Sequence, residues 1–160
     1  MNTMTKKRTK GPAPILYFAY GSNLSEAQML ARCPGARPAG RGALRGYRLA
    51  FAGYSELWGG AVATLAPDPK GRVRGVLYEL TPADLDALDR WEGHPHYYRR
   101  VRATVTDGRR REQRVHLYVM TPERALGEPA MHYLVALLRA YVSLGFDTAV
   151  LLRAACGGLP

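Results

Sequence analysis

The segment "LYFAYGSNLSEAQML", Leu16–Leu30, joins a strand pattern directly to a helix pattern. Apolar residues occupy both alternating faces of Ile15–Tyr20, which is typical of a strand buried on both sides. Ser25 is then a candidate N-cap, and Gln28 three residues later completes a capping-box pattern. A short polar turn, Tyr20–Asn23, lies between the two elements. The first question that the sequence raises is whether this turn holds a ligand.

Two interpretations of the turn remain open from the sequence. The start of a helix presents backbone N–H groups at the positive end of its dipole, so it can hold an anion. Gly21 would let a ligand approach the backbone, and Ser22 and Asn23 add side-chain donors. The glycines of a dinucleotide fingerprint or a P-loop are missing, which favours a small anion such as a carboxylate. An ordinary turn leading into a capped helix explains the same residues.

In the rest of the chain, strand patterns outnumber helix patterns. The "PDPKG" stretch at 67–71 is a strong turn signal, and 40–46 is a Gly- and Arg-rich loop. Helices are expected from Thr81, around 134–141 and near 147–155. About six strands with few crossover helices indicate an α+β protein, either a mixed sheet or a small barrel. The strands are expected at 15–20, 47–51, 61–65, 73–80, 101–106 and 114–120.

Length and composition predict one compact domain. The chain has 160 residues, of which 47% are hydrophobic and 22% charged, as in ordinary globular proteins. Residues 1–14 have the character of a disordered basic tail without the apolar segment of a secretory signal. The sequence contains no stretch of about 18 apolar residues, so no membrane span is predicted. Cys33 and Cys156 form no C-x-x-C pattern, which fits reduced thiols in a cytoplasmic protein.

The net charge of +10 raises the question of nucleic-acid binding. Seven arginines lie between Arg99 and Arg114. No nucleic-acid motif accompanies them, and they surround an Asp107–Gly108 turn, where solvated charge is expected. The sequence therefore favours a small anionic ligand over nucleic acid.

The segment "LDRWEGHPHYY", Leu88–Tyr98, contains a candidate acid/base residue. Glu92 is predicted at the C-terminal end of a helix, where the dipole disfavours a carboxylate. Asp89 on the same face would repel it, and Trp91 would help to remove water from it. These effects raise the pKa of a carboxyl group, so Glu92 could exchange a proton near neutral pH. A solvated glutamate in the last helical turn is the alternative.

Two other chemistries have weaker patterns. A hydrolase elbow requires G-x-S-x-G, whereas Ser22 is followed by Asn23 and Leu24. His94 and His96 form an H-x-H pair, but no further histidine or cysteine stands at a spacing typical of a metal site. The sequence therefore favours neither a serine nucleophile nor a metal centre.

Taken together, the two segments resemble the gamma-glutamylcyclotransferase-like family. The similarity covers roughly residues 15–145, and the pairing of Y-G-S-N with a later E-G around a G-V-x-Y strand is its most specific feature. The matching motifs are "LYFAYGSNL" at Leu16–Leu24, "WGGAVATL" at Trp58–Leu65, "VRGVLYEL" at Val73–Leu80, "LDRWEG" at Leu88–Gly93 and "LYVMT" at Leu117–Thr121.

The resemblance implies a small mixed six-stranded β-barrel or strongly curled sheet with flanking helices, formed by 15–160 as one catalytic domain. It implies cyclisation of a gamma-glutamyl group to 5-oxoproline with release of an amino acid or amine. Neither a metal nor a cofactor is implied, and Glu92 would be the acid/base. The implied substrate-binding residues are Tyr20, Gly21, Ser22, Asn23, Leu24, Tyr98, Tyr118 and Tyr133.

Several alternatives stay open at this point. A related lyase-like enzyme would act on gamma-glutamyl-amine adducts, and a non-catalytic ligand-binding or interaction protein could use the same fold. The Y-G-S-N form differs from Y-G-S-L of the glutathione-specific branch, which makes free glutathione a poorer candidate substrate. The leaving group is not encoded in a recognisable motif, and a homodimer is compatible with the sequence.

Overall fold

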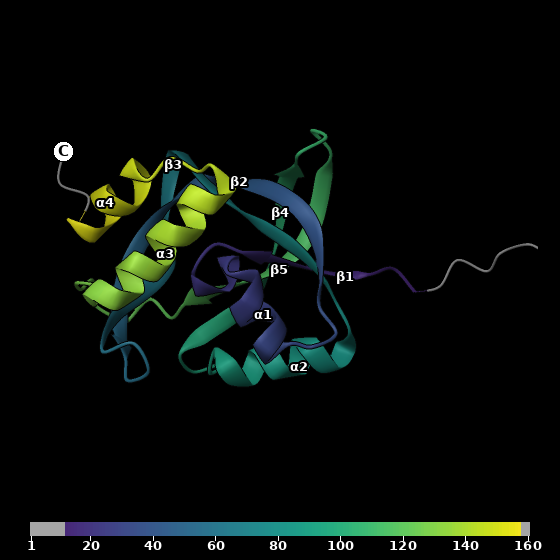
Figure 1. The fold of residues 1–160 in the computed structure, drawn as a ribbon, viewed down its shortest axis with the longest axis horizontal. Helices are drawn as coiled ribbons and strands as arrows, with labels where there is room; N and C mark the ends of the chain where they lie inside the picture. Colours follow the sequence, from purple (N-terminus) through teal and green to yellow (C-terminus); the bar gives the residue numbers. More distant parts are fainter. Residues whose placement is uncertain (1–11, 158–160) are drawn as a thin grey trace, which may run out of the picture.

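A computed structural model describes residues 12–157 of the chain. The predicted basic tail therefore lies almost entirely outside the described residues, as do 158–160. The chain folds as a closed barrel with strand order β1-β3-β2-β4-β5, accompanied by helices (Figure 1). The elements are β1 (Ile15–Ala19), the 3-10 helix η1 (Ser22–Leu24), α1 (Glu26–Arg32), β2 (Arg37–Ser55), β3 (Gly60–Leu80), α2 (Pro82–Trp91), β4 (Tyr98–Asp107), β5 (Glu112–Met120), α3 (Met131–Leu144) and α4 (Ala149–Ala155).

The α+β barrel expected from the sequence is confirmed, with five strands in place of six. The difference arises because 61–65 and 73–80 belong to one long strand, β3. The loop expected at 40–46 is wrong, because these residues lie inside β2 and pair with β3. The turn signal at 67–71 produces a bulge rather than a chain reversal. The register shifts there, from Arg45 opposite Arg72 to Tyr47 opposite Pro67. The long antiparallel pairing with β2 keeps β3 continuous across this stretch, although its prolines and glycine disfavour a strand locally.

β1 leads directly into the polar turn and fixes its position in the barrel. It pairs antiparallel with β3 and meets β5 in parallel at Tyr17, opposite His116. Phe18 and Ala19 are fully buried, in agreement with a strand covered on both sides. The chain leaves this buried strand directly into η1 and α1, so the turn is anchored by the core.

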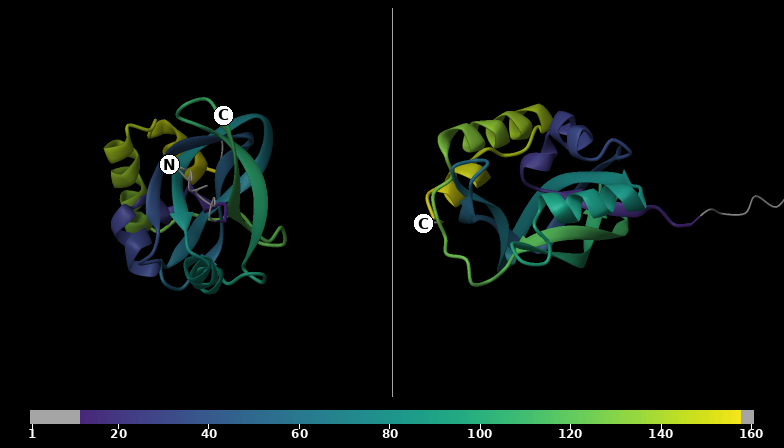
Figure 2. Two further views of the ribbon diagram at one scale, coloured as in Figure 1. Left: turned by 90° about the vertical axis from the view of Figure 1, so that its right-hand side faces the viewer. Right: turned by 90° about the horizontal axis from the view of Figure 1, so that it is seen from below.

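The helix starts predicted at Ser25 and Thr81 are confirmed. The Ser25 side chain accepts a hydrogen bond from the backbone N–H of Gln28 and caps α1. Thr81 and Asp84 form a reciprocal capping box at the start of α2. Figure 2 shows α1, α3 and α4 along one side of the barrel, with α2 at its lower edge in the left-hand view. Within residues 12–157, no helix has the length and apolar character needed to cross a membrane.

Candidate active site

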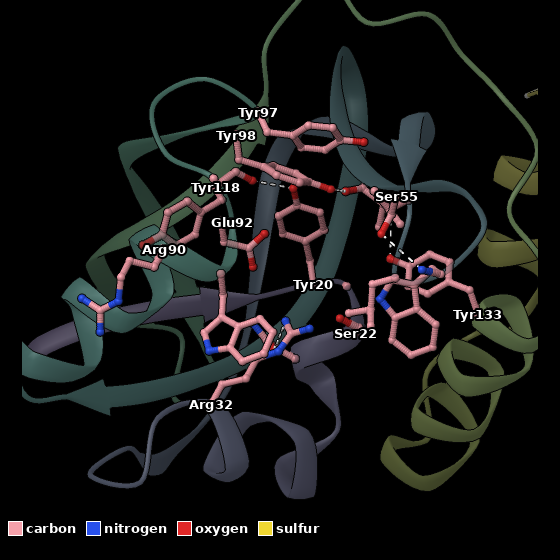
Figure 3. Close-up of a pocket in the computed structure, with 18 of the residues that line it drawn as sticks. Tyr20, Ser22, Arg32, Ser55, Arg90, Glu92, Tyr97, Tyr98, Tyr118 and Tyr133 are labelled. Carbon is pink, nitrogen blue, oxygen red and sulfur yellow. Dashed lines mark hydrogen bonds between the residues drawn. The ribbon is translucent and has the colours of Figure 1, made fainter.

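A cavity of about 620 Å³ opens where the turn after β1, the C-terminal ends of α1 and α2, and the β2–β3 connection meet. Tyrosines make up much of its wall, and Figure 3 shows how their side chains gather around Glu92. The residues predicted from the sequence that line it are Tyr20, Gly21, Ser22, Asn23, Glu92, Tyr98, Tyr118 and Tyr133. Leu24 is the exception, because its side chain is buried in the core and does not line the cavity.

Glu92 is placed by the end of α2. Its backbone N–H donates to the carbonyl of Leu88 at 2.8 Å, and Gly93 adopts a φ of 63° that ends the helix. This left-handed conformation is readily adopted by glycine. In Figure 3 the Glu92 carboxylate lies between Tyr20 and Tyr118. The helix end therefore directs one carboxylate into a cavity lined by aromatic side chains.

Burial raises the pKa of Glu92 from 4.5 to about 7, and the positive charge of Arg32 partly opposes this rise. Asp89, expected from the sequence to act as a repelling neighbour, is engaged elsewhere. Its carboxylate forms a salt bridge with Arg100 at 2.7 Å and accepts the Tyr118 hydroxyl at 2.7 Å. Loss of water, and not a second acid, therefore brings Glu92 into the range for proton exchange near neutral pH.

Asn23 fixes the turn by using both ends of its side chain. Its amide nitrogen donates to the Tyr17 hydroxyl at 3.1 Å. Its amide oxygen accepts from Gln28 at 3.1 Å and from Arg32 at 3.2 Å. Gln28 also donates to the Ser22 hydroxyl at 2.7 Å, so its side chain holds the turn instead of completing a capping box. The turn is thus a rigid part of the cavity wall.

Gly21 lies in a narrow space within this turn. A Cβ atom added there would be 3.3 Å from Cβ of Ala63 and 3.7 Å from the hydroxyl oxygen of Tyr133. Because 3.3 Å is tighter than ordinary van der Waals contact, a side chain would push the turn away from β3 or fill the cavity. The glycine therefore keeps open the part of the cavity next to Tyr133.

Three of the cavity tyrosines, Tyr20, Tyr98 and Tyr133, are neutral groups whose hydroxyls bond to the backbone. The hydroxyls of Tyr20 and Tyr98 donate to the carbonyls of Tyr118 and Ala63, whereas the Tyr133 hydroxyl accepts the backbone N–H of Ala63 at 3.0 Å. Burial raises the pKa of Tyr20, Tyr98 and Tyr133 above the ordinary range of a phenol. Since the Tyr133 oxygen is an acceptor in its recorded bond, its proton remains available for a ligand.

Several further lining residues were not predicted as site residues from the sequence, among them Arg32, Tyr54, Leu57 and Trp91. Arg32 ends α1 and Trp91 ends α2. Tyr54 lies near the end of β2, and Leu57 belongs to the connection between β2 and β3. They come from three separate segments, and no local pattern joins them. Two weak signals existed: Arg32 lies on the short helix that starts at the turn, and Trp91 precedes Glu92 and was expected to help remove water from it.

The histidine pair does not form a metal centre in the described part of the chain. Nδ1 of His94 accepts the backbone N–H of Arg100 at 3.0 Å. Within residues 12–157, no group of three or more His, Cys, Asp or Glu side chains could hold a metal ion. Cys33 is buried and Cys156 is exposed, and both are free thiols.

The barrel and its cavity define a small α+β protein that presents one half-buried acid, Glu92, among tyrosines. Residues 17–134 match the family described as gamma-glutamyl cyclotransferase, AIG2-like. The chain therefore belongs to the gamma-glutamyl cyclotransferase, AIG2-like family, and the resemblance seen in its motifs is confirmed.

Individual relatives agree with this assignment. A gamma-glutamylcyclotransferase of Bos taurus is 32% identical over 119 residues, covering 71% of this chain and 63% of the bovine protein. A gamma-glutamylcyclotransferase of Mus musculus is 35% identical over 83 residues, covering 49% of this chain and 44% of the mouse protein. The match thus spans less than two thirds of either relative. A solved structure of a gamma-glutamyl cyclotransferase superposes with a TM-score of 0.81 at 25% identity, covering 89% of this chain and 86% of the other.

Proposed function

We propose that the protein cyclises the gamma-glutamyl group of a small substrate to 5-oxoproline and releases an amino acid or amine, without a metal or cofactor. The observation that carries the proposal is Glu92, a carboxyl group with a pKa of about 7 inside a tyrosine-lined cavity. Such a group is partly ionised near neutral pH and can both accept and return a proton. Family membership supports the same reaction.

In the proposed mechanism, ionised Glu92 accepts a proton from the alpha-ammonium group of the substrate. The resulting amine attacks the gamma-carbonyl carbon of the same molecule, forming the ring C–N bond and placing negative charge on the carbonyl oxygen. Glu92 then returns the proton to the leaving nitrogen as the original C–N bond breaks and the carbonyl re-forms. The ring nitrogen, which still carries two protons after the attack, loses one of them, and the released amine takes up a proton to become an ammonium group. Holding the chain in a folded conformation supplies proximity, and no covalent enzyme intermediate is required.

The turn and Tyr133 supply groups that suit such a substrate. The backbone N–H groups of Gly21, Ser22 and Asn23 would hold the alpha-carboxylate, and Gly21 leaves room for it. The backbone N–H of Leu24 donates to the carbonyl of Gly21 at 3.0 Å and closes the turn. The Tyr133 hydroxyl, whose oxygen already accepts the Ala63 amide, would donate its proton to the charged gamma-carbonyl oxygen. Burial keeps that hydroxyl protonated, because it raises the pKa of Tyr133.

Incubation with gamma-glutamyl-alanine tests the proposal directly. The expected products are 5-oxoproline and alanine in equal amounts, measured by mass spectrometry, with loss of turnover in Glu92→Gln. Glutamine has nearly the same size and cannot transfer the proton. Near wild-type turnover in this variant would exclude Glu92 as the acid/base. If a wider series of gamma-glutamyl amino acids and gamma-glutamyl amines gave no 5-oxoproline, a non-catalytic binding protein would be the better explanation.

A further inference from the structure

Large apolar side chains stand exposed at the mouth of the cavity that holds Glu92. Tyr54, Leu57 and Trp91 are 63%, 66% and 55% exposed, and all three line this cavity. A single exposed apolar residue is ordinary on a protein surface, but several gathered at the edge of a cavity mark a binding surface. The mouth is therefore suited to an apolar group that extends outward from the reacting centre.

A positive charge stands beside this apolar rim. The guanidinium carbon of Arg32 lies 4.7 Å from the centroid of the Trp91 ring, and one guanidinium nitrogen donates to Asn23 at 3.2 Å. No acidic side chain among residues 12–157 forms a salt bridge with Arg32. Its guanidinium therefore retains donors for an anionic group of a ligand. Figure 3 places Arg32 on the side of Glu92 opposite Tyr98.

The size of the cavity leaves room beyond the glutamyl group. Its 620 Å³ falls within the range of about 300–1,000 Å³ that accommodates a whole drug-sized ligand. Tyr20 and Tyr133 are buried in the wall of the cavity, whereas Tyr54, Leu57 and Trp91 are exposed at its mouth. Arg32 is half-buried and lies over the Trp91 ring. The outer part is large enough for a second residue of the substrate.

We propose that Arg32, Tyr54, Leu57 and Trp91 form an outer subsite that binds the leaving group and selects amino acids with a bulky apolar side chain and a free carboxylate. This assignment rests on the proposed cyclisation. The leaving nitrogen, which Glu92 protonates, is attached to the same carbon as that carboxylate. A cation close to Glu92 is consequently within reach of the carboxylate, while the side chain of the leaving residue packs on the apolar rim.

The test compares kcat/KM at about pH 8 for gamma-glutamyl-phenylalanine, gamma-glutamyl-glycine and gamma-glutamyl-phenethylamine, which lacks the leaving-group carboxylate. For the wild-type protein, kcat/KM is expected to be about tenfold or more higher for gamma-glutamyl-phenylalanine than for gamma-glutamyl-glycine. Trp91→Ala should remove most of this preference. Val142→Ala is the matched control, because Val142 is 70% exposed on α3 and does not line the cavity.

Arg32→Gln separates the role of the carboxylate from general damage to the site. We expect kcat/KM to fall about tenfold more for gamma-glutamyl-phenylalanine than for gamma-glutamyl-phenethylamine, as for loss of one charge-assisted hydrogen bond. Any change in the proton affinity of Glu92 affects both substrates alike and cancels in their ratio. An equal fall for both substrates would overturn the role of Arg32 in binding the leaving group. A wild-type protein that does not distinguish phenylalanine from glycine would overturn the subsite.

Binding to the Glu92→Gln variant keeps the two proposals distinguishable. Calorimetric titration of this variant with the same three compounds measures their relative Kd without turnover. If no compound is turned over by the wild-type protein but phenylalanine still binds tighter than glycine, the cyclisation fails and the subsite stands. If the compounds are turned over and bind without preference, the subsite fails and the cyclisation stands.

Discussion

Replacing Glu92 with glutamine should make the protein more stable while it removes the proposed activity. The folded protein holds the carboxyl proton more tightly than the unfolded chain, because burial raises the pKa of Glu92 from 4.5 to about 7. As the pH rises from about 4.5 to 7, this carboxyl ionises in the unfolded chain while it stays largely protonated in the folded protein, so the wild-type protein loses stability. Below that window the carboxyl is neutral in both states, so the difference between variant and wild type vanishes.

The size of the gain follows from the two pKa values. A displacement from 4.5 to about 7 corresponds to roughly 3 kcal/mol at 1.36 kcal/mol per pKa unit. Glu92 is only partly buried as a residue, so solvent reduces the effect. We expect about 1–2 kcal/mol at pH 8, which corresponds to a Tm increase of roughly 2–8 °C for a chain of this size.

The assay is chemical and thermal unfolding at pH 4 and pH 8. Glu79→Gln is the matched control, because Glu79 is exposed on β3 and its replacement changes the net charge by the same amount. A gain at pH 8 that is absent at pH 4 and absent from the control is the expected result. Equal stabilities of wild type and Glu92→Gln at pH 8, or a loss in the variant, would refute the conclusion that Glu92 is a desolvated acid.

Three further outcomes are expected. The acid limb of kcat/KM should have its midpoint at about pH 7, and Arg32→Gln should move it to higher pH, because Arg32 lowers the pKa of Glu92. An unmoved limb would mean that the charge of Arg32 does not act on Glu92. Gly21→Val should raise KM about tenfold or more while the thermal transition stays cooperative, since its side chain would crowd the cavity; unchanged kinetics would mean that the turn holds no substrate. Tyr133→Phe should cost about 1–3 kcal/mol of unfolding free energy, because the Ala63 N–H loses its acceptor, and should lower kcat about tenfold or more; a stability loss with unchanged kcat would restrict Tyr133 to a structural role.

Features that depend on neighbouring residues in the chain were readable from the sequence. The buried strand before Tyr20 and the helix starts at Ser25 and Thr81 each follow from a short pattern of side chains with a local physical cause. The placement of Glu92 at the end of α2 is equally local, since Gly93 terminates the helix. The turn and the acid could therefore be selected as candidates before their spatial relation was known.

Pairing between distant segments decided the rest. The bulge at 67–71 was predicted as a turn between strands, and its continuation within β3 depends on β2 as its partner. Asp89 was expected to face Glu92, but Arg100 and Tyr118 engage its carboxylate from β4 and β5. Two carboxylates that are close in the sequence repel each other only if neither is engaged by another group. Here the pairing of the barrel strands brings Arg100 and Tyr118 to Asp89.

The sequence by itself determined the class of fold, the polar turn and the acidic residue, because helix starts, helix ends and buried strands are encoded over a few residues. The tertiary structure alone decided that Glu92 is desolvated, that Leu24 faces the core, and that Arg32 and Trp91 meet at the cavity mouth. The desolvation of Glu92 and the shape of the cavity result from several helices, strands and turns packed together. No one of these elements excludes water or forms the cavity by itself, so neither property can be read from a short stretch of sequence.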